Sequence, residues 1–248
     1  MIYYSKTMKK IHFIKLNLIK KISIFLGIIF LLTSCRLEID GELYVADVID
    51  VGEGNGILNT PMNLSFEMSS KDKCNEDKEE ISNILKNYFI NFVAKDCYSE
   101  DFNSFLRIGA DIPIIIDPVP GDGKVDVSDQ SVVSFAVVKG ENEQSNYYSS
   151  YLALNNQLFE LISKDIKSKY YQTLKLDKTK IKLAINNDGR ETEEIRFASS
   201  FVNGKPVVFP QNFKIERRQK IDYHGSDVTT AAFNQDKLAY IFTIIKAK

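Results

Sequence analysis

Residues 222–227 read DYHGSD and bring together the three side-chain types of a hydrolytic triad. His224 is the only histidine beyond residue 34. A triad is normally assembled from distant segments, because adjacent side chains rarely converge on one reacting atom. No G-x-S-x-G sequence accompanies the segment, which therefore favours a turn or loop over a catalytic site.

Three further segments match part of a known site. Ser70 to Lys73 fits S-x-x-K, but neither S-D-N nor K-T-G follows it. Gly52 to Gly56 lacks the G-x-G-x-x-G spacing of a dinucleotide site and favours a hairpin loop. Asp117 to Asp129 matches the second half of a calcium loop, but its first and third ligand positions fall on Pro118 and Pro120, so a solvated turn is favoured. We therefore expect no catalytic residue, no cofactor and no metal site.

Carboxylates are the remaining candidates for catalysis. The first half of the chain is rich in them, but no spacing singles out a pair for general acid and base chemistry. Asp47 interrupts an apolar stretch, which leaves two interpretations open. It is either a buried carboxyl with a raised pKa, or a bulge or strand end that bonds to the backbone.

The residues before Cys35 resemble a bacterial lipoprotein signal peptide. Six lysines and no acidic residue accompany the apolar run Ile22 to Leu32, and Thr33 and Ser34 then lead to the cysteine. The run would cover only about 16 Å as a helix, too short to span a membrane. The resemblance implies that residues 1–34 are removed and that Cys35 is lipidated, with palmitate among its acyl chains. Either Met1 or Met8 fits as the start.

The anchor also predicts where the domain lies. Residues 36–40 reach at most about 17 Å before the first expected strand, so the domain should lie against its membrane. An aspartate after the lipidated cysteine resembles an inner-membrane retention signal; here that residue is Arg36. We therefore expect the periplasmic face of the outer membrane. The alternative is the outer leaflet of the cytoplasmic membrane.

Charge limits the class of partner. Residues 35–248 carry a net charge of −7, which argues against nucleic acid. The charge is uneven, with −11 in residues 35–140 and +4 in residues 141–248. The second part contains the lysines Lys164, Lys167, Lys169, Lys175, Lys178, Lys180 and Lys182. They fit either a solvated surface or a binding surface for anionic lipid, cell-wall polymer or an acidic protein.

Hydrophobic periodicity predicts an α+β domain over residues 35–248. Strands are expected at residues 42–51, 61–68, 105–116 and 131–139, and in several segments from 180 to 245. Two main amphipathic helices, 77–93 and 148–170, should pack against the antiparallel sheet or sheets, the first starting at a capping box of Asp77 and Glu80. Pro113 indicates an edge strand or a bend. Gly140 to Asn146 is a candidate joint between two lobes.

Cys74 and Cys97 are predicted to form a disulfide. An exported domain meets an oxidising compartment, and lipidation of Cys35 leaves an even count of two thiols. A straight helix over residues 77–93 would be about 25 Å long, whereas a disulfide needs Cα atoms within about 7 Å. The bridge therefore requires a shorter or bent helix, and two free buried thiols are the alternative.

The opening from Cys35 to Asp47, followed by Cys74, the amphipathic helix and Cys97, is similar to uncharacterised bacterial lipoproteins found near prophage or mobile-element genes. The resemblance implies the anchor and no particular activity. Because no catalytic constellation is complete, we expect a non-catalytic binding or interaction module in the cell envelope. Its lipid would hold it in the membrane, and its partner would be an envelope protein or an anionic surface. The alternative is a lipid-anchored hydrolase that uses carboxylates.

Overall fold

The computed structural model describes residues 34–117, 131–170 and 173–248. The chain divides into two compact units, Met1–Ser34 and Cys35–Lys248. Of the turn predicted from Asp117 to Asp129, residues 118–129 lie outside the described residues. The strands are β1 (Ser34–Cys35), β2 (Leu37–Tyr44), β3 (Leu58–Met68), β4 (Ile90–Glu100), β5 (Asn103–Ile116), β6 (Val133–Glu141), β7 (Ser145–Leu154), β8 (Thr173–Leu174), β9 (Lys180–Asn186), β10 (Glu193–Phe197), β11 (Ser200–Val202), β12 (Lys205–Val207), β13 (Gln211–Ile215), β14 (Lys220–Gly225) and β15 (Leu238–Ala247).

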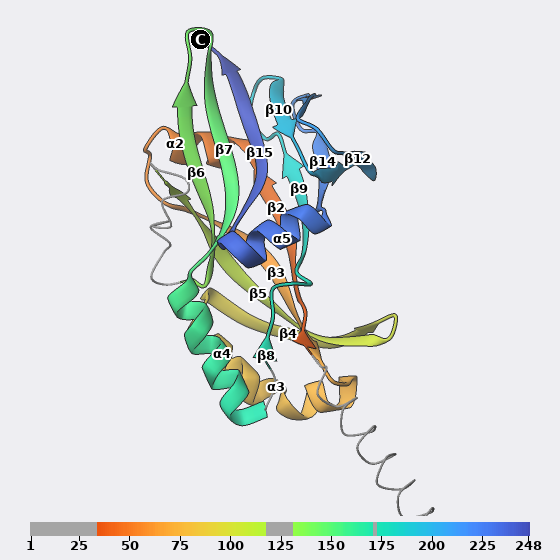
Figure 1. The fold of residues 1–248 in the computed structure, drawn as a ribbon. Coiled ribbons are helices and arrows are strands. Elements are labelled where there is room, and N and C mark those ends of the chain that lie inside the picture. Colours follow the sequence, from red (N-terminus) through yellow and green to blue (C-terminus); the bar gives the residue numbers. More distant parts are fainter. Residues whose placement is uncertain (1–33, 118–130, 171–172) are drawn as a thin grey trace, which may run out of the picture. The chain divides into compact units, whose positions relative to one another are not determined.

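One mixed sheet of 13 strands forms most of the second unit (Figure 1). The strands follow the order β12-β11-β14-β9-β2-β3-β5-β6-β7-β15-β10-β13, and β4 pairs with β5 outside this path. The pairs β2–β9 and β5–β6 are parallel, and the other pairs are antiparallel. Long-range pairing therefore dominates the fold.

The two ends of this sheet lie close together. β10 and β11 belong to opposite ends of the strand order. Only two residues connect Phe197 to Ser200, which limits their Cα separation to about 11 Å. The rings of Phe197 on β10 and Tyr223 on β14 also stack, with centroids 6.1 Å apart. The sheet is therefore strongly curved and nearly closed around one core.

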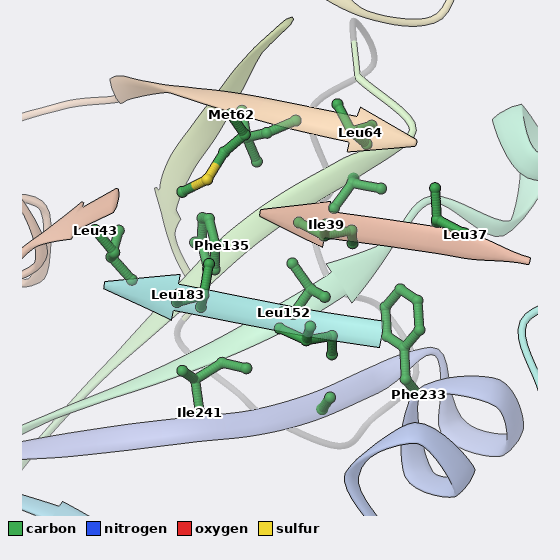
Figure 2. Packing of buried hydrophobic residues seen from close by; sticks show 14 of the residues in the cluster. Leu37, Ile39, Leu43, Met62, Leu64, Phe135, Leu152, Leu183, Phe233 and Ile241 are labelled. Carbon is green, nitrogen blue, oxygen red and sulfur yellow. The ribbon is translucent and has the colours of Figure 1, made fainter. Parts of the chain in front are cut away.

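Side chains from facing strands meet inside the curved sheet (Figure 2). Ile39 and Leu43 of β2 and Leu183 of β9 point toward Leu152 of β7 and Ile241 of β15. All five are buried. Successive side chains of a strand point to opposite faces, so the outer face of β2 and β9 carries their polar residues.

Four helices lie among the described residues: α2 (Val45–Gly52), α3 (Lys71–Leu85), α4 (Asn156–Tyr170) and α5 (Asp227–Asp236). α3 and α4 lie together at one end of the sheet (Figure 1). The Tyr88 hydroxyl, just beyond α3, donates to Asp165 of α4 at 2.7 Å. The prediction of an α+β domain with two main packed helices is wrong, because most of the described chain is strand and the helices are short.

Both predicted helices run into strands. α3 begins at Lys71, where the Ser70 hydroxyl accepts a hydrogen bond from the Lys73 N–H, so Asp77 and Glu80 lie inside the helix and do not cap it. It ends at Leu85, and residues 90–93 belong to β4. Residues 148–154 belong to β7 and α4 begins at Asn156. β7 ends with three consecutive buried residues, which hides the alternation of a strand.

The strand predicted at residues 42–51 is largely a helix. β2 ends at Tyr44 and α2 follows it directly. The Tyr44 side chain does not cap α2; the Asp188 carboxylate does, accepting a hydrogen bond from the Ala46 N–H at 3.1 Å. This cap comes from a distant part of the sequence, so local periodicity could not indicate it. Asp47 consequently lies in the first turn of a helix and not at a strand bulge.

Of the other fold predictions, some are confirmed and one is wrong. The strands at 61–68 and 105–116 are confirmed within β3 and β5. The edge predicted at Pro113 is wrong, because β5 lies inside the sheet; Pro113 falls between Asp111, where pairing with β4 ends, and Ile114, where pairing with β6 begins. Residues 140–146 form the tip of the β6–β7 hairpin within one compact unit.

Candidate functional site

The triad-like segment 222–227 has a structural role. Asp222 and His224 lie on the exposed face of β14, and Ser226 caps α5. The Ser226 hydroxyl accepts from the Thr229 N–H at 3.3 Å and donates to the Ser199 carbonyl at 2.5 Å. The turn predicted here is therefore a strand that leads into a helix, and the serine is occupied by capping.

The other partial motifs also lie in secondary structure. Ser70 caps α3, and Lys73 pairs with Asp77 of the same helix at 3.1 Å. Residues 52–56 end α2 and turn into β3, where a hairpin loop was expected; Gly54 and Gly56 take positive φ angles of 88° and 98° in this turn. Among residues 34–117, 131–170 and 173–248, no three His, Cys, Asp or Glu side chains are grouped to hold a metal ion. Within those ranges no helix has the length and apolar character to cross a membrane.

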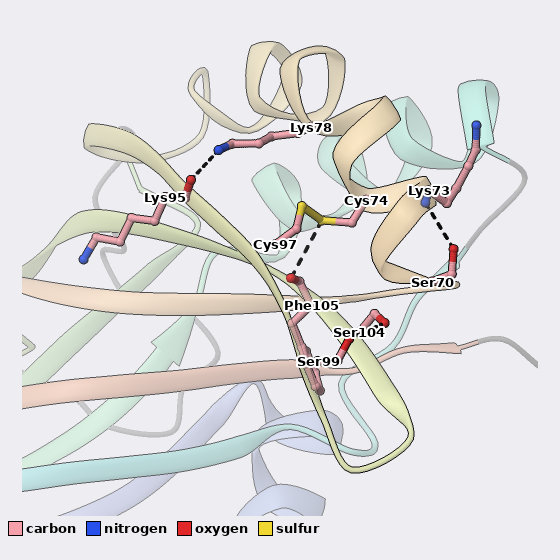
Figure 3. Close-up of a disulfide and its surroundings, with 9 residues drawn as sticks. All are labelled: Ser70, Lys73, Cys74, Lys78, Lys95, Cys97, Ser99, Ser104 and Phe105. Atoms are coloured by element: carbon pink, nitrogen blue, oxygen red, sulfur yellow. Dashed lines mark hydrogen bonds between the residues drawn. A yellow bond between two sulfur atoms is a disulfide. The ribbon is translucent and has the colours of Figure 1, made fainter.

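The structure joins Cys74 to Cys97 in a disulfide, with Cα atoms 6.0 Å apart (Figure 3). The geometric objection disappears because α3 ends at Leu85 and is shorter than expected, so that β4 leads the chain back to bring Cys97 beside Cys74 near the start of the helix. The sulfur of Cys74 lies 3.7 Å from the Phe105 carbonyl oxygen. The disulfide therefore holds α3 against β4 and β5.

A hollow of about 530 Å³ opens on the outer face of the sheet beside the start of β2. We call it the basic hollow; its charged and titratable lining consists of Arg36, Lys178, Lys180, Lys182, His224 and the acidic residues Asp177 and Asp227. Three of its lining residues are in register and form a row across it: Phe201 of β11, His224 of β14 and Lys182 of β9. Sheet register thus assembles the hollow from segments far apart in sequence.

The cations of the basic hollow differ in whether they form ion pairs with other residues. Arg36 pairs with Glu38 at 2.9 Å, and its guanidinium lies 4.9 Å from the centre of the Phe105 ring. Lys180 contacts the same Glu38 at 3.5 Å. Lys178 and Lys182 have no ion-pair partner in the described part of the chain. Two of the four strong bases are therefore free to interact with a ligand.

A second hollow of about 350 Å³ shares Lys182 with the first. It is lined by the carboxylates Glu38, Asp40 and Glu100. Arg107 also lines it, with its guanidinium 4.3 Å from the centre of the Tyr98 ring. Glu38 is neutralised by Arg36 and Lys180, whereas Asp40 and Glu100 form no ion pair among the described residues.

A third hollow, of about 290 Å³, lies beyond the other end of β2. We call it the acidic hollow; Asp50, Glu191 and Glu193 line it together with Arg190 and Lys246. β2 has eight residues, so the acidic hollow is separated from Arg36 by about 26 Å of strand. The two ends of one strand therefore carry opposite charge.

Two carboxyls at the acidic end have raised pKa values. Burial raises the pKa of Glu193, although Lys246 at 3.5 Å opposes this. Burial also raises the pKa of Asp47, and the charges of Asp188 and Asp50 add to the effect. Of the two interpretations of Asp47, the carboxyl with a raised pKa is the one that the structure supports, although Asp47 is only partly buried.

Six of the seven lysines noted between residues 164 and 182 form two groups, and Lys175 lies between β8 and β9. Lys164, Lys167 and Lys169 lie on α4, where Lys169 pairs with Glu80 at 2.5 Å. Lys178, Lys180 and Lys182 lie in the basic hollow. Arg36 and His224 were not predicted as members of the basic hollow, because their contribution depends on sheet register. Glu193 of the acidic hollow was not predicted because no sequence pattern marks it.

A family model described as a domain of unknown function, DUF7424, matches residues 37–248. The chain belongs to this family. The match begins at the first residue of β2 and extends to residue 248, so all three hollows lie within the family domain apart from Arg36. Searches of curated proteins and of solved structures found no match. The resemblance to an uncharacterised family is therefore confirmed, whereas the lipid anchor and the prophage setting stay predictions.

Proposed function

We propose that the protein is an envelope lipoprotein, held in the membrane by lipid on Cys35, whose domain is a non-catalytic binding module. The observation that carries the proposal is the position of the basic hollow. Arg36 lines it and immediately follows the predicted anchor, so a lipid on Cys35 would lie next to the hollow. Leu37 is already paired with Phe66 in the sheet, which leaves no flexible tether.

A lipid-anchored binding module also agrees with the way the charged groups are used. Ser226 and Ser70 are occupied as helix caps, and Glu38 is held by two cations. The lysines without ion-pair partners in the described residues face outward in a concave surface, which suits the capture of an anionic group. The partner class we favour is therefore an anionic surface or an acidic envelope protein.

The anchor is tested by a peptide mass map of the full-length protein expressed in a bacterial host. In the parent protein we expect a mature N-terminus at Cys35 that carries acyl chains. The Cys35→Ser variant should keep residues 1–34. Ser34→Ala is the matched control, because it preserves a small residue before the cysteine and should still be processed. Unmodified Cys35 in the parent protein would overturn the proposal.

The membrane that holds the protein is tested by density-gradient fractionation. Because Arg36 follows Cys35, we expect co-migration with outer-membrane markers in a host with two membranes. Recovery with inner-membrane markers would instead favour the outer leaflet of the cytoplasmic membrane.

The acidic hollow favours a second candidate, a lipid-anchored hydrolase that uses carboxylates. A carboxyl with a raised pKa is what a general acid requires, and Glu193 is such a group. Turnover of a panel of fluorogenic glycosides and esters, lost in Glu193→Gln with folding unchanged, would establish this candidate. No turnover by the parent protein across that panel would count against it.

A further inference from the structure

We infer that the basic hollow binds the phosphate-bearing headgroup of an anionic phospholipid, so that the domain contacts the membrane at a second point beside its anchor. The inference rests on the proposed lipid anchor and goes beyond it, because it names the ligand of a cavity that the anchor does not fill. Its basis is the charge, the rim and the position of the hollow.

The charge of the hollow suits a phosphate group. Its lining has four strong bases against two carboxylates, Asp177 and Asp227. Lys178 and Lys182 provide ammonium groups without ion pairs in the described part of the chain, and the Arg36 guanidinium is fixed nearby by Glu38 and Phe105. Ammonium and guanidinium groups bind phosphate oxygens through charge-assisted hydrogen bonds.

The rim of the hollow suits the boundary of a bilayer. Phe201 lines the hollow and is 42% exposed, although it is a large apolar residue. Val208 and Phe209 follow β12, the neighbour of β11, and are 67% and 80% exposed. Exposed aromatic and aliphatic side chains beside basic groups are typical of surfaces that lie in the membrane interface.

The position of the hollow selects a lipid over a free anion. The Cα atoms of Cys35 and Arg36 are about 3.8 Å apart. Acyl chains on Cys35 would hold this residue at the membrane surface, where headgroups surround it. A tethered site meets its ligand at a high effective concentration, so weak individual contacts suffice for occupancy.

Native mass spectrometry of the full-length lipoprotein in detergent tests this inference. The probes are dihexanoyl phosphatidylglycerol, dihexanoyl phosphatidylcholine and inorganic phosphate. We expect phosphatidylglycerol to bind more tightly than phosphatidylcholine. The double variant Lys178→Gln/Lys182→Gln should lose about fivefold in phosphatidylglycerol affinity per lysine. Lys214→Gln is the matched control, because Lys214 is exposed on β13 and does not line the hollow.

Three results would overturn the inference: equal binding of the two lipids, an unchanged preference in the double variant, or binding of inorganic phosphate in place of the lipid. Thermal melting monitored by circular dichroism should show the variants folded, since the substituted side chains make no ion pair in the described structure. The intact mass in the same spectra reports whether Cys35 is acylated. The experiment therefore distinguishes a missing lipid anchor on Cys35 from a basic hollow that does not bind the phospholipid headgroup.

Discussion

The basic and acidic hollows lie at opposite ends of β2 and differ in what their charges do for the fold. At the acidic end, Asp188 caps α2 and Glu193 pairs with Lys246. At the basic end, Lys178 and Lys182 have no ion pair among the described residues. The side chains of Asp188 and Glu193 thus bond to other parts of the fold, whereas those of the two lysines form no ion pair in the described part of the chain. Charged groups without a structural role are the better indicators of a binding surface.

Loss of the disulfide should give the largest change in stability, and it should act at the basic end. The variant Cys74→Ala/Cys97→Ala removes a link across 23 residues, which should lower the free energy of unfolding by about 3 kcal/mol. Figure 3 shows the disulfide beside Phe105, the residue whose ring carries Arg36. Amide exchange should therefore increase at residues 97–107 and change little in α2.

Urea unfolding measures the size of this effect, and reduced parent protein serves as the control because it should lose the same stability. Free thiols in parent protein purified from the envelope would contradict the disulfide itself.

A substitution at Gly52 should give the next largest effect, now at the acidic end. A Cβ atom there would lie 2.5 Å from Cδ1 of Tyr148 and 3.3 Å from Cγ1 of Val137. Gly52→Ala should therefore overpack the contact of α2 with the sheet and cost about 2 kcal/mol in the free energy of unfolding. Gly140→Ala is the control, because nothing lies within 4 Å of its added Cβ. Equal stability of the two variants by urea unfolding would contradict the close contact of α2.

Removal of the α2 cap should give a smaller effect at the same end. Asp188→Ala leaves the Ala46 N–H without its acceptor and should cost about 1 kcal/mol. Because the Asp188 charge raises the pKa of Asp47, the variant should also lower that pKa, which NMR titration can follow. Asp222→Ala removes the same charge from an exposed position on β14 and should change neither quantity. An unchanged Asp47 pKa in Asp188→Ala would contradict the electrostatic effect of Asp188 on Asp47.

The smallest expected effect is the pH dependence due to Glu193. Its pKa is raised above the value of 4.5, so the folded state holds this proton more tightly than the unfolded chain. The contribution of the carboxyl to stability therefore falls as pH rises from about 4.5 through the folded pKa. Relative to the parent, Glu193→Gln should be more stable at pH 7 than at pH 4 in urea unfolding. The opposite trend would show that the pair with Lys246 outweighs burial.

The sequence indicated elements that are stabilised locally and missed those determined by distant contacts. β3 largely alternates and β5 is an almost continuously buried apolar run, and both were predicted within a few residues. Residues 45–52 have an apolar spacing that fits a strand or a short helix, and the cap from Asp188 decides between them. Tyr148 and Leu152 are four residues apart, which fits both periods, and pairing of β7 with β6 and β15 makes this segment a strand.

The candidate site was predictable only in part. The lysine-rich segment identified Lys178, Lys180 and Lys182, and the cysteine count indicated the Cys74–Cys97 pair. His224 and Phe201 reach the basic hollow only because β9, β14 and β11 pair in one register. Register depends on the whole curved sheet, and nothing in the local sequence specifies it.

Hydrogen–deuterium exchange of the full-length lipoprotein tests most directly whether the basic end faces the membrane. The protein would be placed in nanodiscs containing phosphatidylglycerol and compared with nanodiscs of phosphatidylcholine. We predict slower exchange at residues 176–182 and 200–209 in the anionic discs, and no change at residues 186–193 beside the acidic hollow. Equal exchange at both ends, or protection confined to residues 186–193, would contradict the proposed orientation.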